Sequence, residues 1–265
     1  MGLNLKKALI LILGMAVLTG TGFSQVEFTA FGLYNLNISY PNEGQFNSRV
    51  EGVVETWHSE WLAFFANVLE QGDGLGFGAR IAYEVTPSTG FEASIEYISA
   101  ETAFTGGIVD NLLDKMESIG YSGWIQTANK SGGNIIRYYG NIVFNFPNAS
   151  RMTPYVTAGL GITQFKIQKN GPQIMTGYGA VDEKISIYYE DVSALTFNGG
   201  LGVKALFTPN IGLRADARIF VCDPNFDQMI SFEAMGVTVF EDEGSYIQGG
   251  THIDTNLNIG FFVRF

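Results

Sequence analysis

Cysteine, histidine and basic residues are scarce in this sequence. One cysteine, Cys222, and two histidines occur among 265 residues. A single cysteine excludes an intrachain disulfide framework and a cysteine-rich zinc or iron–sulfur site. The 15 lysine and arginine residues are outnumbered by 26 acidic residues, so the chain has no broad basic surface for nucleic acid. Nucleic-acid binding is therefore excluded, and we predict neither a cofactor nor a metal site.

Charged residues and long apolar runs are also few. Only 15% of the residues are charged, whereas 46% are hydrophobic, a composition that excludes a disordered chain. Beyond the first 24 residues, no uncharged stretch reaches the roughly 18 residues that a membrane-spanning helix requires. The sequence therefore leaves two classes, a secreted soluble protein and a membrane β-barrel.

The N-terminal 24 residues have the pattern of a secretory signal peptide. Lys6 and Lys7 precede the apolar run 8–18, and small residues occur shortly before Gln25. The apolar run is too short to cross a bilayer as a helix. We therefore predict that residues 1–24 are removed and that residues 25–265 form the mature domain.

Alternation with period two is the dominant pattern in the rest of the chain. Within 252–265, the odd positions are mainly apolar and the even positions mainly polar, as expected for a strand with two different faces. Most of the predicted strands are long enough to cross a membrane at the usual tilt. Eight strands are predicted, at 26–38, 75–85, 91–98, 135–146, 155–166, 194–207, 211–221 and 252–265.

The connections between these strands alternate in length, which predicts their topology. Three are tight and rich in turn-forming residues, and four are long. This alternation is typical of an eight-stranded antiparallel up-and-down transmembrane β-barrel, with short periplasmic turns and long extracellular loops. A soluble β-protein would instead expose continuous apolar faces to water. The tight turns lie near 87–90, 147–151 and 208–210, and the long loops near 39–74, 99–134, 167–193 and 222–251.

Aromatic and glycine residues recur at defined places in the predicted strands. Near the periplasmic ends, aromatic side chains of apolar parity predict a lipid-facing girdle. Glycine pairs such as Gly159 and Gly161 lie in mid-strand, where they allow close packing against aromatic rings. The predicted girdle consists of Phe28, Tyr83, Phe91, Phe146, Phe207 and Phe265.

Three segments carry a resemblance to a known family. They are the strand–turn–strand block GLGVKALFTPNIGLRADAR at 200–218, the segment PYVTAGLGI at 154–162, and the C-terminal strand ending in Phe265. Together they resemble the small eight-stranded outer-membrane barrels of the OmpA-type transmembrane domain in Gram-negative-type bacteria. The resemblance implies an outer-membrane location and recognition of the C-terminal strand by the barrel insertion machinery. It implies no catalytic residue, and we expect no peptidoglycan-binding domain after Phe265.

Charged residues of inward parity are predicted to form a network in the barrel lumen. The interior of an eight-stranded barrel is just wide enough to be filled by side chains, so these charges must pair across it. We expect a plug of salt bridges; the alternative is a narrow path for ions or small solutes that the same pairs gate. The predicted lumen residues are Arg80, Glu84, Glu92, Glu96, Arg137, Lys204, Arg214, Asp216, Arg218, Asp254 and Arg264.

The long loops contain most of the acidic residues and two apolar stripes. Twenty acidic residues and only five basic ones fall in the loops, and the densest acidic group, 241–243, suggests bridging of divalent cations to surface glycolipid. A solvated acidic rim is the alternative. Apolar residues spaced by three and four predict short helices within 50–68 and 108–119 that cap the barrel mouth or lie at the outer interface. The stripe of the first helix packs against other loops, which is the favoured interpretation, or contacts lipid or a partner.

We therefore predict a non-enzymatic outer-membrane protein with a structural or surface-interaction role. Its expected partners are outer-membrane lipid and glycolipid, together with an extracellular molecule that binds the acidic loops. A lipid A-modifying enzyme is a further alternative. Its candidate residues are Ser39, His252 and Asp254, which share inward parity near the outer end, whereas the neighbours of His58 point in different directions on a helix.

Overall fold

The computed structural model describes residues 25–41, 43–46, 69–104, 123–125, 130–167, 173–178, 181–234 and 237–265. The predicted signal segment at 1–24 and the helical stripes within 50–68 and 108–119 lie outside the described residues. Within the described part, no helix is long and apolar enough to cross a membrane.

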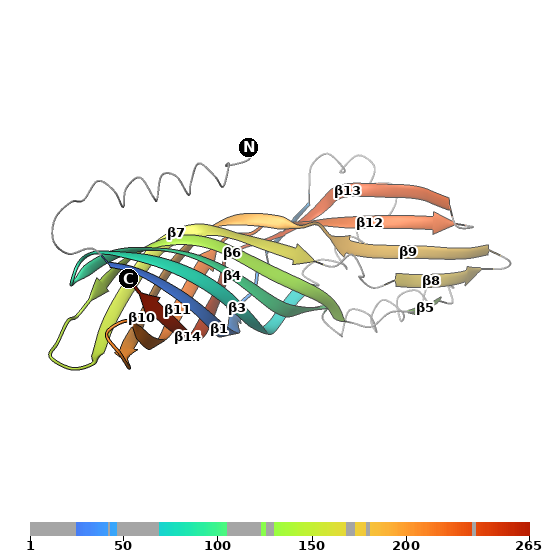
Figure 1. Ribbon diagram of the computed structural model, residues 1–265. Coiled ribbons are helices and arrows are strands. Elements are labelled where there is room, and N and C mark those ends of the chain that lie inside the picture. Colours follow the sequence, from blue (N-terminus) through green and yellow to red (C-terminus); the bar gives the residue numbers. More distant parts are fainter. Residues whose placement is uncertain are drawn as a thin grey trace.

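Eight long strands form a closed antiparallel barrel (Figure 1). Around the barrel they follow the order β1-β14-β11-β10-β7-β6-β4-β3, the up-and-down order that the alternating connections predict. Each of the eight predicted segments falls on one of these strands, which confirms the predicted fold. The bounds are β1 Gln25–Ser39, β3 Leu69–Thr86, β4 Thr89–Phe104, β6 Lys130–Asn145, β7 Met152–Ile167, β10 Val192–Leu206, β11 Ile211–Cys222 and β14 His252–Arg264.

A second sheet of six strands extends the barrel at the end opposite the short turns (Figure 1). Its strands occupy parts of all four segments that we predicted to be loops. Sequence alternation did not reveal them: β2, β5 and β8 have six residues or fewer, and the pairing of β12 with β13 is interrupted by register shifts. The nine residues of β9 pair without a register shift, and we missed this strand. In sheet order they are β2 Glu43–Phe46, β13 Val237–Gly249, β12 Phe226–Ala234, β9 Val181–Tyr189, β8 Gln173–Tyr178 and β5 Gly123–Ile125.

The three short turns and the C-terminal residue share the other end of the barrel. There, Val26 and Phe265 exchange backbone hydrogen bonds of 3.2 and 2.9 Å, which join the first and last strands. Neighbouring turns are also linked, since the backbone nitrogen of Asn145 donates to the carbonyl of Ser88. This end is therefore a continuous hydrogen-bonded rim.

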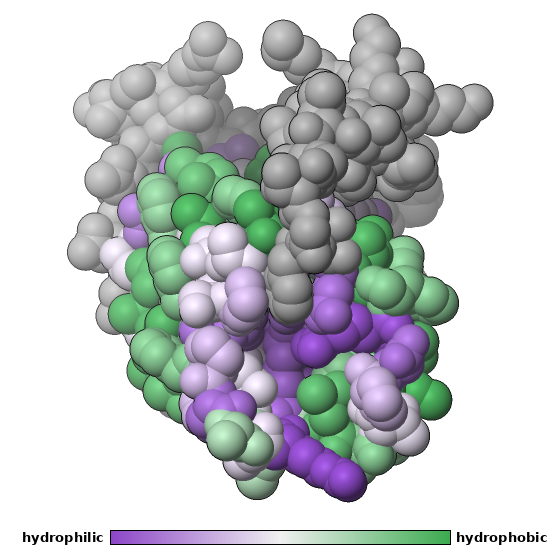
Figure 2. Space-filling view, turned by 60° about the vertical axis from the view of Figure 1, so that its left-hand side comes forward, coloured by the Kyte–Doolittle hydropathy of each residue, from purple (hydrophilic) through white to green (hydrophobic). Residues whose placement is uncertain are grey.

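The outer surface of the barrel is apolar. Five of the six predicted girdle residues are exposed, from 51% for Phe28 to 73% for Phe265, and Tyr83 is half-buried. In Figure 2, which brings the turn end forward, hydrophobic residues cover the flanks of the barrel and hydrophilic residues gather in the middle of that end. An apolar belt of this extent is the surface that a bilayer covers.

Glycines on the inner face make room for large side chains of the neighbouring strand. Gly202 lies opposite Tyr155 in the register of β10 and β7, and a Cβ atom at Gly202 would lie 2.5 Å from the Tyr155 ring. Gly161 accommodates Tyr139 in the same way, with 2.5 Å to the Tyr139 Cβ. The aromatic side chains can therefore lie over the glycines of the neighbouring strand and fill the narrow lumen.

We expect Gly202→Ala to lower the free energy of unfolding by about 1–3 kcal/mol, because the added methyl group overpacks the lumen against Tyr155. The measurement is urea-induced unfolding in lipid vesicles. Gly199→Ala, on the outer face of the same strand, is the matched control, because its nearest neighbour would be a backbone oxygen at 3.8 Å. Equal stability of the two variants would contradict the packing role.

Candidate functional site

The charged side chains of inward parity gather in the barrel lumen. Ten of the eleven predicted residues are buried, and the side chain of Arg264 is 17% exposed at the turn end. One further acid, Glu27, is fully buried among them. The sequence could have placed Glu27 in the lumen, because odd-numbered residues of this strand, such as Phe31 and Leu33, point inward. The structure buries all three side chains.

At the turn end of the lumen, one lysine joins two carboxylates. Lys204 Nζ lies 3.0 Å from Glu27 Oε2 and 2.9 Å from Glu84 Oε1. The guanidinium of Arg264 contacts the same two carboxylates at 3.4 and 3.5 Å. Two acids and two bases thus neutralise one another at this level.

Three arginines share two carboxylates at the centre of the lumen. Glu92 lies 2.7 Å from Arg214 and 2.9 Å from Arg218. Asp216 lies 2.7 Å from Arg218 and 2.9 Å from Arg80. These five residues come from β3, β4 and β11, so the ion pairs connect opposite parts of the wall.

The outer level of the lumen is built on Arg137. Its guanidinium pairs with Asp254 and lies 3.9 Å from Glu96. Glu96 also accepts hydrogen bonds from Tyr139 and, at 2.7 Å, from Asn256. His252 Nε2 lies 2.8 Å from Oδ2 of Asp254, the carboxylate that pairs with Arg137. Each carboxylate at this level therefore has both a cationic and a neutral partner.

Aromatic rings support the buried guanidinium groups. The guanidinium carbon of Arg214 lies 4.4 Å from the centre of the Tyr155 ring, and that of Arg137 lies 4.3 Å from the Phe220 ring. Such contacts are attractive where water is excluded. They also hold the planar groups in orientations that suit their carboxylate partners.

The charges of the lumen balance. Among the residues that the structure describes, six acidic and six basic side chains point inward, so their formal charges cancel when His252 is neutral. Every acid that we did not place in a loop belongs to this set. The acids are Glu27, Glu84, Glu92, Glu96, Asp216 and Asp254; the bases are Arg80, Arg137, Lys204, Arg214, Arg218 and Arg264.

Aromatic side chains cover the outer level of the lumen. The Tyr40 ring is stacked on Phe226 at 5.4 Å, and Phe165 meets Phe226 edge to face at 5.5 Å. His252 lies edge-on to Tyr40 and Phe165. A hydrogen bond of 2.6 Å from Gln248 to the carbonyl of Pro41 ties the segments that carry these rings.

The candidate catalytic group is not assembled. His252 and Asp254 point into the lumen and contact each other, but Ser39 is exposed. A register shift between Asn37 and Ser39 changes the parity of β1 at its outer end, so the predicted inward position of Ser39 is wrong. His58 lies outside the described residues.

A metal site is likewise not evident in the part of the chain that the structure describes, where no three histidine, cysteine, aspartate or glutamate side chains are arranged to hold an ion. Cys222 is a buried free thiol. The strongest arrangement of polar groups in the described residues is therefore the ion-pair network of the lumen.

We expect Lys204→Met to lower the free energy of unfolding by about 3–5 kcal/mol, because Glu27 and Glu84 would lose a buried cation. Adding Glu84→Gln should recover part of this loss by restoring the charge balance. Urea unfolding in lipid vesicles measures both effects. Lys166→Met, at an exposed position of β7, is the control and should change stability by no more than about 0.5 kcal/mol. A Lys204 variant as stable as this control would show that the network does not stabilise the barrel.

Comparison with known proteins gives a family match over nearly the whole chain. The model of the outer membrane protein beta-barrel domain matches residues 8–265. No curated protein sequence matches significantly. Among solved structures, the chain is similar to the outer membrane protein OprG from Pseudomonas aeruginosa, with a TM-score of 0.51, 11% identity, and coverage of 91% of this chain and 96% of OprG.

Two further solved structures show lower similarity. A major outer membrane protein from Thermus thermophilus has a TM-score of 0.48 and 10% identity, with coverage of 92% of this chain and 100% of that one. The outer membrane protease OmpT from Escherichia coli has a TM-score of 0.36 and 9% identity, with coverage of 91% and 96%. The family match, together with the closed eight-stranded barrel, shows that the chain belongs to the outer membrane protein beta-barrel domain family and is an outer-membrane protein.

Proposed function

We propose that this protein is a non-enzymatic, closed outer-membrane barrel with a structural or surface-interaction role. The observation that carries the proposal is the balanced set of six acids and six bases in the lumen. Its members contact one another at three levels along the barrel, from Glu27 near the turns to Asp254 near the outer end. Such a network fills the lumen and fixes the positions of the surrounding strands.

The energetics of buried charges favour a closed lumen. A passing ion would have to separate pairs such as Arg218 and Glu92, whose side chains are both fully buried. Removing one partner from a buried pair costs about 3–5 kcal/mol, because the remaining charge is left uncompensated. The aromatic layer of Tyr40, Phe165 and Phe226 adds a second barrier at the outer end.

The proposed surface role rests on the contrast between the barrel and its extracellular segments. The outer wall offers an apolar belt to membrane lipid, with Phe28 and Phe265 in edge-to-face contact near the turns. The segments beyond the barrel contain the acidic run 241–243, in β13. We propose glycolipid, through bridging divalent cations, and an extracellular molecule as partners of these segments, and the barrel insertion machinery as partner of the C-terminal strand.

A narrow pore is the second candidate. The specific observation in its favour is Asn198, a buried lumen residue whose amide oxygen and nitrogen both lack a hydrogen-bond partner in the protein. Buried polar groups of this kind bind water. The lumen thus has capacity for internal water, which a conducting path would also need.

Planar-bilayer recordings separate the two candidates. We expect refolded protein spanning residues 25–265 to produce no discrete conductance steps, because the lumen remains filled by its ion pairs. Insertion is verified by the shift in gel mobility between heated and unheated samples. The variant Arg218→Gln serves as the comparison. Steps in the wild-type recording whose size or open time changes in this variant would contradict the closed barrel and establish a pore gated by the central ion pairs.

Mass spectrometry of lipid A tests the non-enzymatic assignment. We expect lipid A from an Escherichia coli strain that expresses the protein to match that of a strain with an empty vector, because Ser39 does not face His252 and Asp254. A new lipid A species that disappears with His252→Ala would overturn the assignment. The His252 variant must show the same heat-dependent mobility shift as the wild type.

A further inference from the structure

The apolar belt of the barrel ends in a row of polar residues on β4, β6 and β7. On β7, the belt reaches Ile162, which is 50% exposed, and outward positions beyond it are polar. In the register of the barrel, Asn134 on β6 lies opposite Ser99 on β4 and opposite Lys166 on β7. Paired side chains of neighbouring strands lie about 5 Å apart. We call Ser99, Asn134 and Lys166 the polar row.

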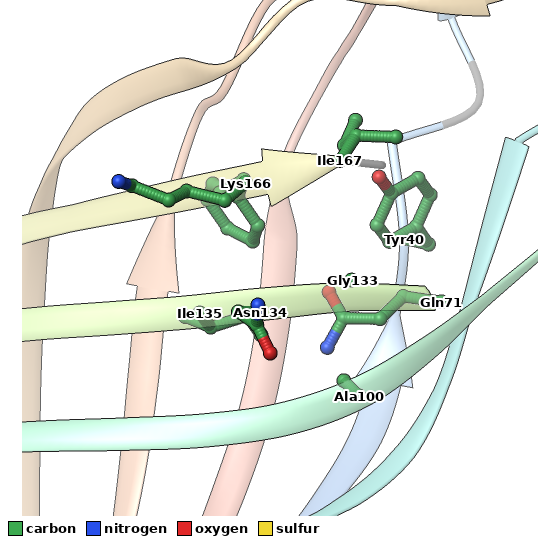
Figure 3. Close-up of a pocket in the computed structure, with 9 residues that line it drawn as sticks. Tyr40, Gln71, Ala100, Gly133, Asn134, Ile135, Lys166 and Ile167 are labelled. Atoms are coloured by element: carbon green, nitrogen blue, oxygen red, sulfur yellow. The ribbon is translucent and has the colours of Figure 1, made fainter. Parts of the chain in front are cut away.

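A hydrogen bond orients the amide in the middle of the polar row. The hydroxyl group of Tyr97 donates to Asn134 Oδ1 at 2.6 Å. Asn134 and Lys166 also border a small pocket at the outer end of the barrel, and Figure 3 shows the amide oxygen of Asn134 on the β4 side and its nitrogen on the β7 side. The N–H groups of Asn134 are therefore directed toward the strand that carries Lys166.

Lys166 is an exposed cation without a carboxylate partner among the residues that the structure describes. The carboxylate of Asp191, at the start of the neighbouring strand, instead accepts a hydrogen bond of 3.0 Å from the backbone nitrogen of Ile167. Figure 3 shows the amine of Lys166 extending back along β7, away from Ile167. The ammonium group is thus turned from Asp191 toward the apolar belt.

The position and charge of the polar row define the partner that it fits. An ammonium group at the edge of the hydrocarbon is costly without a counter-ion, and anionic lipid headgroups attract lysine at a membrane surface. Lysine binds phosphate as a point charge, and the oxygens of one phosphate group can accept from both an ammonium and an amide. Because the row lies at the end opposite the periplasmic turns, the lipid in reach is that of the outer leaflet.

We propose that Asn134 and Lys166 bind a phosphate group of the anionic glycolipid in the outer leaflet. The Lys166 ammonium neutralises the phosphate, and the Asn134 amide donates a hydrogen bond to one of its oxygens. Ser99 continues the row on the other side of Asn134 with an exposed hydroxyl group. This site deepens the proposed role of glycolipid as a partner, but it requires neither divalent cations nor the acidic run in β13.

Native mass spectrometry of the barrel in detergent micelles, with diphosphorylated lipid A as the probe, tests the site. All samples contain EDTA, which removes the cations that bridging by the acidic segments would need. We expect Lys166→Met to weaken Kd by about fivefold. Asn134→Asp keeps an acceptor for Tyr97 but replaces the amide donor by a negative charge, and it should weaken Kd by about tenfold or more.

Matched controls separate the polar row from general charge effects. Arg151→Met and Asn148→Asp make corresponding changes at exposed positions of the turn end, and both should bind lipid A like the wild type. Lys166→Arg keeps the charge and should retain binding. Lipid A without phosphate groups should bind equally to the wild type and to Lys166→Met. Each variant is checked for the heat-dependent mobility shift.

Three results would overturn the proposal. The first is equal affinity of the wild type, Lys166→Met and Asn134→Asp for diphosphorylated lipid A. The second is displacement of lipid A by an excess of inorganic phosphate, which would assign the row to free phosphate. The third is wild-type binding that is absent in EDTA and returns with Ca²⁺, which would favour bridging by the acidic segments over direct contact with the polar row.

Discussion

Neutralisation of the six basic side chains that point into the lumen is the constraint on which the rest of this barrel depends. The wall is surrounded by lipid and the lumen is narrow, so an unpaired guanidinium could not recover its lost hydration. Each basic residue therefore needs a carboxylate from another part of the wall, as when Arg214 on β11 meets Glu92 on β4. Because these pairs span the lumen, they fix the distances between strands that are not hydrogen-bonded neighbours.

The glycines and aromatic residues of the inner face make this pairing possible. Gly202 leaves space for Tyr155, the Tyr155 ring supports Arg214, and Arg214 reaches Glu92. A bulkier residue at the glycine position would displace the ring and then the arginine. The small residues of the wall thus determine the positions of the charges, although they make no polar contact themselves.

Most of the barrel could be predicted from the sequence because one physical rule governs it. A wall one strand thick, with lipid outside and charges inside, imposes period two on every strand, so parity assigned residues such as Arg137 to the lumen. Glu27 was left out of the predicted lumen residues because its strand is mainly apolar. Ser39 was misplaced because a register shift reverses parity beyond Asn37, and a local irregularity of this kind leaves no periodic signal.

The extracellular sheet and the small pocket at the outer end of the barrel could not be predicted for a different reason. Beyond the membrane, no lipid imposes alternation, so β12 and β13 pair with register shifts and their sequences resemble loops. The pocket combines residues from distant segments, among them Tyr40, Gln71 and Phe165. None of these residues belongs to a local motif, because only closure of the barrel brings them together.

The final strand connects closure of the barrel with neutralisation of its charges. β14 pairs with β1 and β11, and its inward side chains reach every level of the network. Asp254 meets Arg137 at the outer level, Asn258 donates to Asp216 at the centre, and Arg264 contacts Glu27 near the turns. Until β14 is in place, the partners of these groups are incomplete and the lumen remains open to water along one side. The strand that completes the backbone hydrogen bonding therefore also completes the electrostatic balance, so a barrel without β14 would lack both.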